Sequence, residues 1–188
     1  NNLPRKTKPK GNREKTNQMQ IKETITGSEP LTSVEVKAYL KIDFTTDDTL
    51  IGTLITGVRQ QIEQFTGLSL VAKTIEYFDE EIEEEIKLPY PEHLAIVEVK
   101  INNTVSTAYI KTGLTQFIIK PNDTSVTGAN DYGFYCKYTT TGTCPQAIKN
   151  EMLKLLDEKY RNRGNTFEGA ISDLSENCYA NLAKYCVI

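Results

Sequence analysis

The stretch Leu31–Ile51, LTSVEVKAYLKIDFTTDDTLI, contains two helix beginnings separated by a short polar turn. Thr32, followed three residues later by Glu35, has the spacing of a capping box, in which each side chain accepts a hydrogen bond from the other residue's backbone. The segment DFTTDD then ends the first helix. Thr46 or Asp47 can cap the second helix, because its side-chain oxygen can accept a hydrogen bond from a backbone N–H of the first turn. Asp47 and Asp48 also lie where the positive end of the helix dipole favours acids.

The second helix is predicted to be amphipathic and to run over residues 47–66. Its apolar residues recur at steps of three and four, the period of a helix with one buried face: Leu50, Ile51, Leu54, Ile55, Val58, Ile62 and Phe65. The short helix before it has its own apolar set: Val34, Val36, Leu40 and Ile42. Gly67 is expected to end the long helix in the left-handed conformation.

After Gly67 the apolar period changes to two, which predicts strands. The segments KTIEYFDEEI, EEIKLP, AIVEVKIN, STAYIKT, TQFIIKP and DYGFYCKYTTTG each have the composition of a short strand. Asn102-Asn103 and Lys111-Thr112-Gly113 are typical of hairpin turns. Residues 71–142 are therefore predicted to form an antiparallel sheet of five or six strands.

Helical periodicity returns in TCPQAIKNEMLKLLDEKYRNRG, residues 143–164, and again in DLSENCYANLAKYCVI at the end of the chain. Pro145 suits a first helical turn, where its missing N–H has no partner to lose. We expect the helix 47–66 to pack against the helix 145–162, with the sheet projecting from one end. The predicted class is α+β, a small antiparallel bundle of about four helices with an inserted β region. The predicted parts are an N-terminal arm (1–28), a helical bundle (29–70 and 143–188) and a β domain (71–142).

Charge is distributed unevenly along the 188 residues, whose formal net charge is −3. Residues 1–22 hold seven basic residues and one acidic residue, whereas the remainder holds 15 basic and 24 acidic residues. The arm therefore carries +6 and the body −9. Free in solution, an arm of this composition buries too little apolar surface to offset its chain entropy. No run approaches 18 apolar residues, so no membrane partner is expected.

The basic arm has three interpretations. It can be a solubilising tail, a segment that binds nucleic acid through phosphate contacts, or an extended peptide that docks on a neighbouring protein. The absence of aromatic residues argues against stacking on single-stranded bases. We favour the docked peptide, with DNA contact second. The candidate partner-binding residues are Arg5, Lys6, Lys8, Lys10, Arg13 and Lys15.

The sequence does not predict catalytic, cofactor-binding or metal-binding residues. It has neither a glycine-rich phosphate loop nor a GxGxxG motif, and its only histidine, His93, lies in the proline-rich turn PYPEHLAI. The acid run Asp79–Lys87, DEEIEEEIK, suits a solvated hairpin tip better than a metal site. Four cysteines (Cys136, Cys144, Cys178 and Cys186) lack zinc-site spacing. Free thiols are favoured over a link between Cys136 and Cys144.

Ten tyrosines and no tryptophan occur in the chain, and several aromatic residues cluster near residue 135. Tyrosine suits protein interfaces because it is half apolar and half polar, yet the same residues also suit half-buried strand packing. Both alternatives remain open for the interface candidates, which are Tyr132, Phe134, Tyr135, Tyr138 and Tyr185.

Several segments together resemble the phage head–tail connector, or adaptor, family. EPLTSVEVKAYLKID followed by DDTLIGTLITGVRQQIEQFTGLSL is similar to the family's N-terminal signature, IKLPYPEHLAIVEVKINN to its first β segment, and PQAIKNEMLKLLDEKYRNRG to its next helix. The resemblance covers about residues 29–188. The first signature is carried by Leu31, Thr32, Glu35, Val36, Lys37, Leu40, Ile42, Asp43, Asp47, Asp48, Ile62, Glu63, Phe65, Thr66 and Gly67. The chain departs from the family in its arm and in its ending, CVI.

The resemblance implies a non-enzymatic virion protein without cofactors. It implies a ring, usually a dodecamer, at the head–tail interface, made in the host cytoplasm. Its partners would be the portal, further tail or ring proteins, and genomic DNA that passes through the lumen without sequence-specific contact. The alternatives are a DNA-binding accessory protein that uses the arm and, less favoured, an enzyme with an acidic metal site on the β region.

Overall fold

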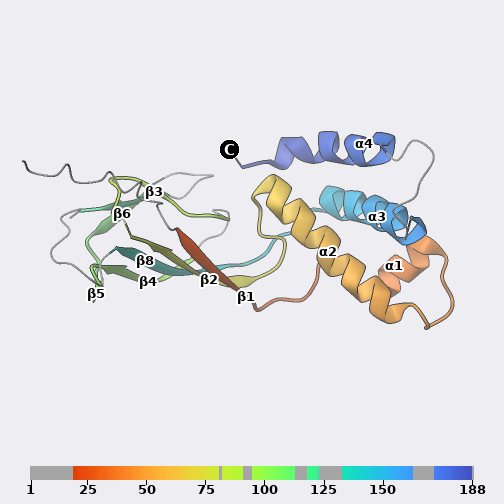
Figure 1. Cartoon of the computed structure of the whole chain (residues 1–188), viewed down its shortest axis with the longest axis horizontal. Helices are drawn as coiled ribbons and strands as arrows, with labels where there is room; N and C mark the ends of the chain where they lie inside the picture. The colour runs from red at the N-terminus through yellow and green to blue at the C-terminus, as the bar shows by residue number, and fades with distance from the viewer. Residues whose placement is uncertain are drawn as a thin grey trace, which may run out of the picture.

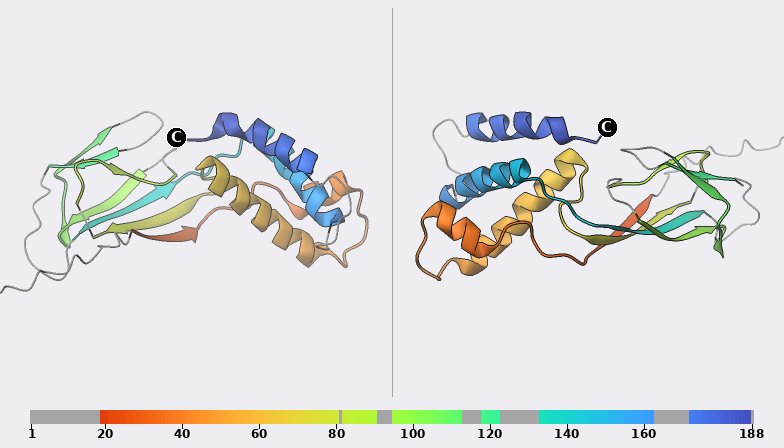
Figure 2. Two further views of the ribbon diagram at one scale, coloured as in Figure 1. Left: turned by 45° about the horizontal axis from the view of Figure 1, so that its top comes forward. Right: turned by 180° about the vertical axis from the view of Figure 1, so that it is seen from behind.

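The computed structural model describes residues 19–80, 82–90, 95–112, 118–122, 133–162 and 172–187. These residues form two parts that follow one another along the long axis of the molecule (Figure 1). One part is helical and the other consists of antiparallel strands, so the predicted α+β class is confirmed. Figure 2 shows from two further directions that helices and strands stay in separate parts.

The described part of the chain contains four α-helices and one 3₁₀ helix: α1 (Ser33–Leu40), α2 (Asp48–Thr66), α3 (Gln146–Arg161), α4 (Ser172–Leu182) and the 3₁₀ helix η1 (Ala183–Tyr185). The first three lie within a residue or two of their predicted positions. The last helix was predicted to continue to residue 188, but it ends at Leu182 and passes into η1.

The ends of α1 and α2 follow from local hydrogen bonds. The Thr32 hydroxyl accepts from the Glu35 backbone N–H at 3.2 Å, and the Glu35 carboxylate accepts from the Thr32 N–H at 2.7 Å, so the predicted capping box is confirmed. Asp47 stands at the start of α2 as predicted, but its side chain makes no capping hydrogen bond to the helix; its carboxylate instead accepts one from the Tyr160 hydroxyl of α3 at 2.6 Å. Gly67 ends α2 with a φ of 74°, as predicted, because glycine adopts this conformation without steric cost.

The helices share one apolar core. Helix α2 packs on α3, α1 contacts both, and α4 packs on α3. The fully buried side chains of this shared core include Ile51, Val58, Ile62, Ile148, Met152, Leu156 and Leu182. Two residues assigned to apolar helix faces are more exposed than expected. Val34 is 77% exposed, because the eight-residue helix α1 turns Val36 inward instead, and Phe65 is 41% exposed beside the ring of Tyr179.

The described strands form two antiparallel sheets. The larger has the order β1-β2-β8-β4-β5 and the smaller the order β3-β7-β6. Their bounds are β1 (Gln20–Ile25), β2 (Lys73–Asp79), β3 (Ile86–Lys87), β4 (Ala95–Ile101), β5 (Thr104–Val105), β6 (Tyr109–Thr112), β7 (Ile118–Pro121) and β8 (Phe134–Thr140).

The two sheets enclose a second core. Inward side chains alternate along β2 and β8, as expected for strands with one buried face, and Ile119 of β7 joins them from the smaller sheet. The predicted turn at Asn102-Asn103 joins β4 to β5, with φ values of 49° and 58° that suit a tight hairpin. A side chain at Gly133 would collide with the Asp79 backbone, with its Cβ only 2.1 Å from the carbonyl oxygen.

The structure corrects two expectations for the β region. The predicted single sheet is two sheets, because β3, β6 and β7 pair with one another instead of extending the larger sheet. Part of the predicted arm also belongs to the larger sheet, since residues 20–25 form β1 and pair with β2 along its whole length. The sequence did not predict this strand, because its own composition gives only a weak strand signal. It is held in place by pairing with β2, some 50 residues later in the chain.

Candidate assembly interface

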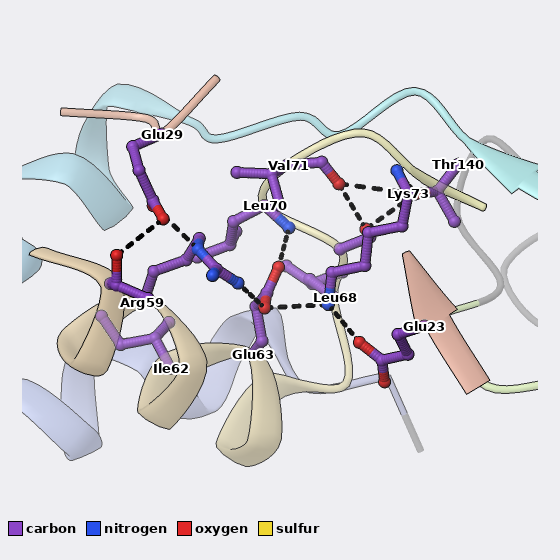
Figure 3. A network of polar contacts seen from close by, with 12 residues as sticks. Glu23, Glu29, Arg59, Ile62, Glu63, Leu68, Leu70, Val71, Lys73 and Thr140 are labelled. Atoms are coloured by element: carbon purple, nitrogen blue, oxygen red, sulfur yellow. Dashed lines mark hydrogen bonds and ion pairs between the residues drawn. The ribbon is translucent and has the colours of Figure 1, made fainter. Parts of the chain in front are cut away.

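A cluster of buried charges joins the helical part to the strands. Arg59 and Glu63 lie one turn apart on α2, and Lys73 begins β2. These three side chains are 1%, 2% and 2% exposed. Figure 3 shows them between the end of α2, the segment that leads into β2 and the residues around β1. We call the three residues, together with Glu23 and Glu29 at their rim, the charged junction.

Glu63 is the central acceptor of the charged junction. Its Oε2 accepts from Arg59 Nη1 at 2.5 Å and from Lys73 Nζ at 2.9 Å, and its Oε1 accepts from the backbone N–H of Leu70 at 2.9 Å. One carboxylate therefore pairs with both buried cations and also fixes the turn after α2. A buried charge is tolerated only when it is paired and hydrogen-bonded in this way.

Two more exposed acids complete the charged junction from the N-terminal side. Glu29 accepts from Arg59 Nε at 2.8 Å and from the Thr56 hydroxyl at 3.0 Å. Glu23 of β1 accepts from Lys73 Nζ at 2.8 Å. The segment that contains β1 is thereby tied to both the long helix and the second strand.

Electrostatics keep Arg59 protonated in its buried position. Burial lowers the pKa of Arg59, but hydrogen bonds and charges from Glu29 and Glu63 outweigh that effect and raise it above the ordinary value. Burial, followed by the charge of Glu23, raises the pKa of Tyr90, whose ring lies 4.3 Å from Lys73 Nζ. Tyr90 therefore stays neutral, and its ring face attracts the ammonium group. Arg59 Nη2 lacks a hydrogen-bond partner among the described residues.

Exposed apolar side chains mark surfaces that can contact other proteins. One group, Met19, Ile21 and Ile25, lies along β1 and the residue before it. A second group, Val34, Tyr39 and Phe44, lies on α1 and the turn that follows it. Further exposed apolar residues on the strands are Val97, Val105 and Ile110.

The predicted interface residues have different locations. Tyr132 and the basic residues Arg5, Lys6, Lys8, Lys10, Arg13 and Lys15 lie outside the described residues. Phe134 and Tyr138 are buried between the sheets, where the Tyr138 hydroxyl donates to the Pro89 carbonyl at 2.8 Å, so core packing accounts for both. Tyr135 and Tyr185 are half-buried, and their assignment to an interface stays a prediction.

The acid run does not form the predicted hairpin tip. Its first residue, Asp79, ends β2 in a buried position, and its last residues begin β3, which pairs with β7 and not with β2. Glu83, Glu84 and Glu85 are exposed between them. A hydrogen bond from Lys120, 2.5 Å long, lowers the pKa of Glu85. The run thus connects the two sheets.

All four cysteines are free, so the prediction of free thiols is confirmed and the link between Cys136 and Cys144 is wrong. Burial raises the pKa of the thiols of Cys136 and Cys178 to about 12, and that of Cys144 to about 11. These three groups are therefore protonated and weakly reactive at neutral pH. His93 lies outside the described residues.

Among the described residues, three or more His, Cys, Asp or Glu side chains never gather closely enough to hold a metal ion. Every helix in the described ranges is too short or too polar to cross a lipid bilayer.

The charged junction was missed at the level of sequence. Glu63 belongs to the connector-like signature, and Arg59 precedes it by four residues, the spacing of a helical ion pair. That signal is ordinary on helix surfaces and does not by itself indicate burial. The remaining partners, Glu23, Glu29 and Lys73, come from other segments, so only the fold brings them together.

Comparison with known proteins gives two kinds of similarity. Residues 34–111 match the family described as "Phage gp6-like head-tail connector protein". A search of the curated proteins found no match.

Solved structures share the fold over most of the chain. A chain from the neck of an empty gene transfer agent particle, computed with sixfold symmetry, is 11% identical with a TM-score of 0.66, and the match covers 89% of this chain and 96% of that one. A chain from the native particle's neck, computed with twelvefold symmetry, is 9% identical with a TM-score of 0.61 over 89% and 96% of the two chains. The resemblance read from the sequence is therefore confirmed: over residues 34–111 the chain matches the phage head–tail connector family.

Proposed function

We propose that this chain is a structural virion protein, a head–tail connector that forms a ring, with a dodecamer as the expected size, between the portal and the tail. The observation that carries the proposal is the agreement of two similarities. The family match covers nearly all of α1, α2 and the strands from β2 to β6, and the fold shared with the neck chains extends over 89% of the chain. The proposed role is non-enzymatic, and the proposed location is the head–tail interface of a virion.

The construction of the molecule supports a load-transmitting role. The four described helices share one core, as expected of a small bundle, and the charged junction fixes that core against the sheets. A connector needs such a fixed angle, because each subunit must meet both its neighbours and the proteins above and below it. Exposed apolar residues on β1 and α1 supply candidate contact surfaces in both parts.

The charge distribution supports passage of DNA through the ring. Outside residues 1–22 the chain carries −9, and an acidic lumen would repel phosphates and let the duplex slide. The basic arm would then act outside the lumen as a tether to the portal or to a neighbouring subunit. The candidate residues for this contact are Arg5, Lys6, Lys8, Lys10, Arg13 and Lys15.

The test is the mass of the native protein, measured alone and after mixing with the portal of the same particle. We expect a closed ring of identical subunits that binds the portal. A species that stays monomeric in both samples would contradict the proposal.

A second candidate function is a DNA-binding accessory protein, favoured by the +6 charge of residues 1–22. It predicts salt-sensitive DNA binding by a monomer, lost when the arm is removed. The deletion should stop at residue 18, because residues 20–25 form β1. If the protein shortened by 18 residues keeps its melting temperature and its ring but no longer holds the portal, the tether role of the arm is supported. Loss of DNA binding alone favours the second function.

A further inference from the structure

Helix α2 has an outward face without charged side chains. The helix is 19 residues long, and its only charged residues are Asp48 in the first turn and the buried pair Arg59 and Glu63. Figure 1 shows α3 and α4 on one side of α2, which forms the lower border of the helical part. Uncharged residues that are exposed or half-buried lie on the side away from the core, and we call them the neutral face: Thr49, Gly52, Thr53, Thr56, Gly57, Gln60 and Gln64.

The lack of charge distinguishes α2 from the helix on which it packs. Helix α3 is 16 residues long and contains seven charged residues, of which Lys159 and Arg161 are exposed. Charged residues are depleted at the centres of protein interfaces compared with the rest of a protein surface. The neutral face, which spans residues 49–64 of α2, therefore has the composition of a contact surface. Leu50 and Leu54, which are half-buried, lie beside it.

The two glycines of the neutral face have no explanation within the described chain. Glycine inside a helix is less favourable than alanine, because it loses more backbone freedom on folding. Neither Gly52 nor Gly57 has a positive φ, and a Cβ atom added at either would meet nothing within 4 Å outside the helix's own backbone. Alanine would therefore fit at both positions. Close approach of another molecule accounts for both glycines, because a missing side chain leaves room for it.

The chemistry of the neutral face favours one kind of partner. DNA is disfavoured, because proteins bind phosphates through lysine and arginine and this face has neither. A second copy of the chain is favoured by charge. Outside residues 1–22 each copy carries −9, so two copies repel each other wherever their acidic surfaces meet. An uncharged face lets two such copies approach with the least repulsion.

We infer that the neutral face of α2 is a contact surface for a second copy of this chain, with Gly52 and Gly57 at the points of closest approach. This inference rests on the proposed ring and names one side of its subunit contact. The same face on both copies would close a dimer, whereas a ring joins two different faces. The neutral face of one subunit therefore packs on another surface of its neighbour.

Alanine at the two glycines should have opposite effects on the subunit and on the ring. Gly52→Ala and Gly57→Ala should each raise the melting temperature of the separated subunit by about 1–4 °C, because alanine is the better helix former. Each should also raise the concentration for half-assembly by at least about fivefold, because the added methyl group overfills a close contact. The measurements are thermal unfolding below the assembly concentration and the mass of the protein at increasing concentration.

The matched control is Asn150→Ala on α3. Asn150 is exposed, and alanine again has the higher helix propensity. This variant should assemble like the wild type. Glycine variants that assemble as well as the wild type, or a control that weakens assembly as much as they do, would overturn the inference.

Thiol labelling measures the contact without a change in assembly. In a chain whose half-buried Cys144 and Cys186 are replaced by serine, Gln60→Cys is the probe. It should react with a maleimide roughly tenfold more slowly in the ring than in the separated subunit, because a covered thiol reacts only when the contact opens. Gln146→Cys, at the exposed start of α3, should react equally in both states. Equal rates for Gln60→Cys in the two states would contradict the contact.

The portal is the competing partner for the neutral face. Protection of Gln60→Cys in the ring before any portal is added supports contact between copies. Protection that appears only after the portal is added would assign the face to the portal and overturn the inference. If the wild-type protein forms no ring with or without the portal, the proposed function fails. If the ring forms but leaves this thiol unprotected, only the assignment of the contact is wrong.

Discussion

The helical part and the charged junction hold the chain together by different means. The core between α2 and α3 is built from apolar side chains such as Ile62 and Leu156. The junction, only one residue further along α2, buries Glu63 between two cations. Apolar contact is non-directional and adapts to substitution, whereas hydrogen-bonded charges demand fixed geometry. The first makes the helical part stable, and the second sets how that part is oriented against the sheets.

The largest expected effect comes from breaking the junction at its centre. Glu63→Ala should lower the free energy of unfolding by about 3–5 kcal/mol, because Arg59 and Lys73 would remain buried without their shared carboxylate. The measurement is equilibrium unfolding in denaturant. The exposed neighbour Gln64→Ala is the control and should change stability by less than about 0.5 kcal/mol. A loss below about 1 kcal/mol for Glu63→Ala would show that the junction is not a structural centre.

The apolar core should tolerate conservative change better than the junction does. Leu156→Ala should cost about 2–5 kcal/mol, but Leu156→Met less than about 1.5 kcal/mol, because the second substitution conserves volume. Leu54→Ala should cost roughly half as much as Leu156→Ala, since Leu54 is only half-buried. The same unfolding measurement applies. Equal losses for the two alanine variants would contradict the observed difference in burial.

Some elements of this fold could be predicted from the sequence and others could not. Helices α1 and α2 were located within a residue or two because their signals are local: the spacing of Thr32 and Glu35, the apolar period, and Gly67. Strand β1 was missed because its register, such as Ile21 opposite Tyr77, depends on a partner far along the chain.

The candidate interface was predictable only in part. The aromatic cluster around residue 135 was noticed, but composition could not decide which side of a strand each residue would face. The register answers that question: Phe134 and Tyr138 point into the core, and Tyr135 lies on the other face. The charged junction forms only where three segments of the chain meet. Of its residues, only Arg59 and Glu63 lie in the same helix, so only this pair could be recognised from the sequence.

A smaller effect is expected at the rim of the charged junction. Glu23→Gln should change the free energy of unfolding by less than about 1 kcal/mol, because Glu23 is partly exposed and water can replace its contact with Lys73. Lys73 would retain its bond to Glu63. Denaturant unfolding of Glu23→Gln beside Glu63→Ala makes the comparison. Similar losses at both positions would mean that the rim and the centre act as one unit.

The smallest effect concerns the cap of α1 and depends on pH. Hydrogen bonds from the backbone and hydroxyl of Thr32 lower the pKa of Glu35 below its ordinary 4.5. The stabilisation is therefore present above pH 4.5 and is lost as the pH falls through the lower folded value. Melting temperatures of wild type and Glu35→Gln, measured from pH 7 downward, should converge in acid. A difference that stays constant with pH would contradict this account of the cap.

The most direct test of the central claim is an electron cryomicroscopy reconstruction of the neck of the particle that carries this protein. The account predicts a ring directly below the portal, in which every subunit fits this fold with the charged junction intact. A neck resolved well enough to trace its chains, with this fold absent from the layer below the portal, would contradict it.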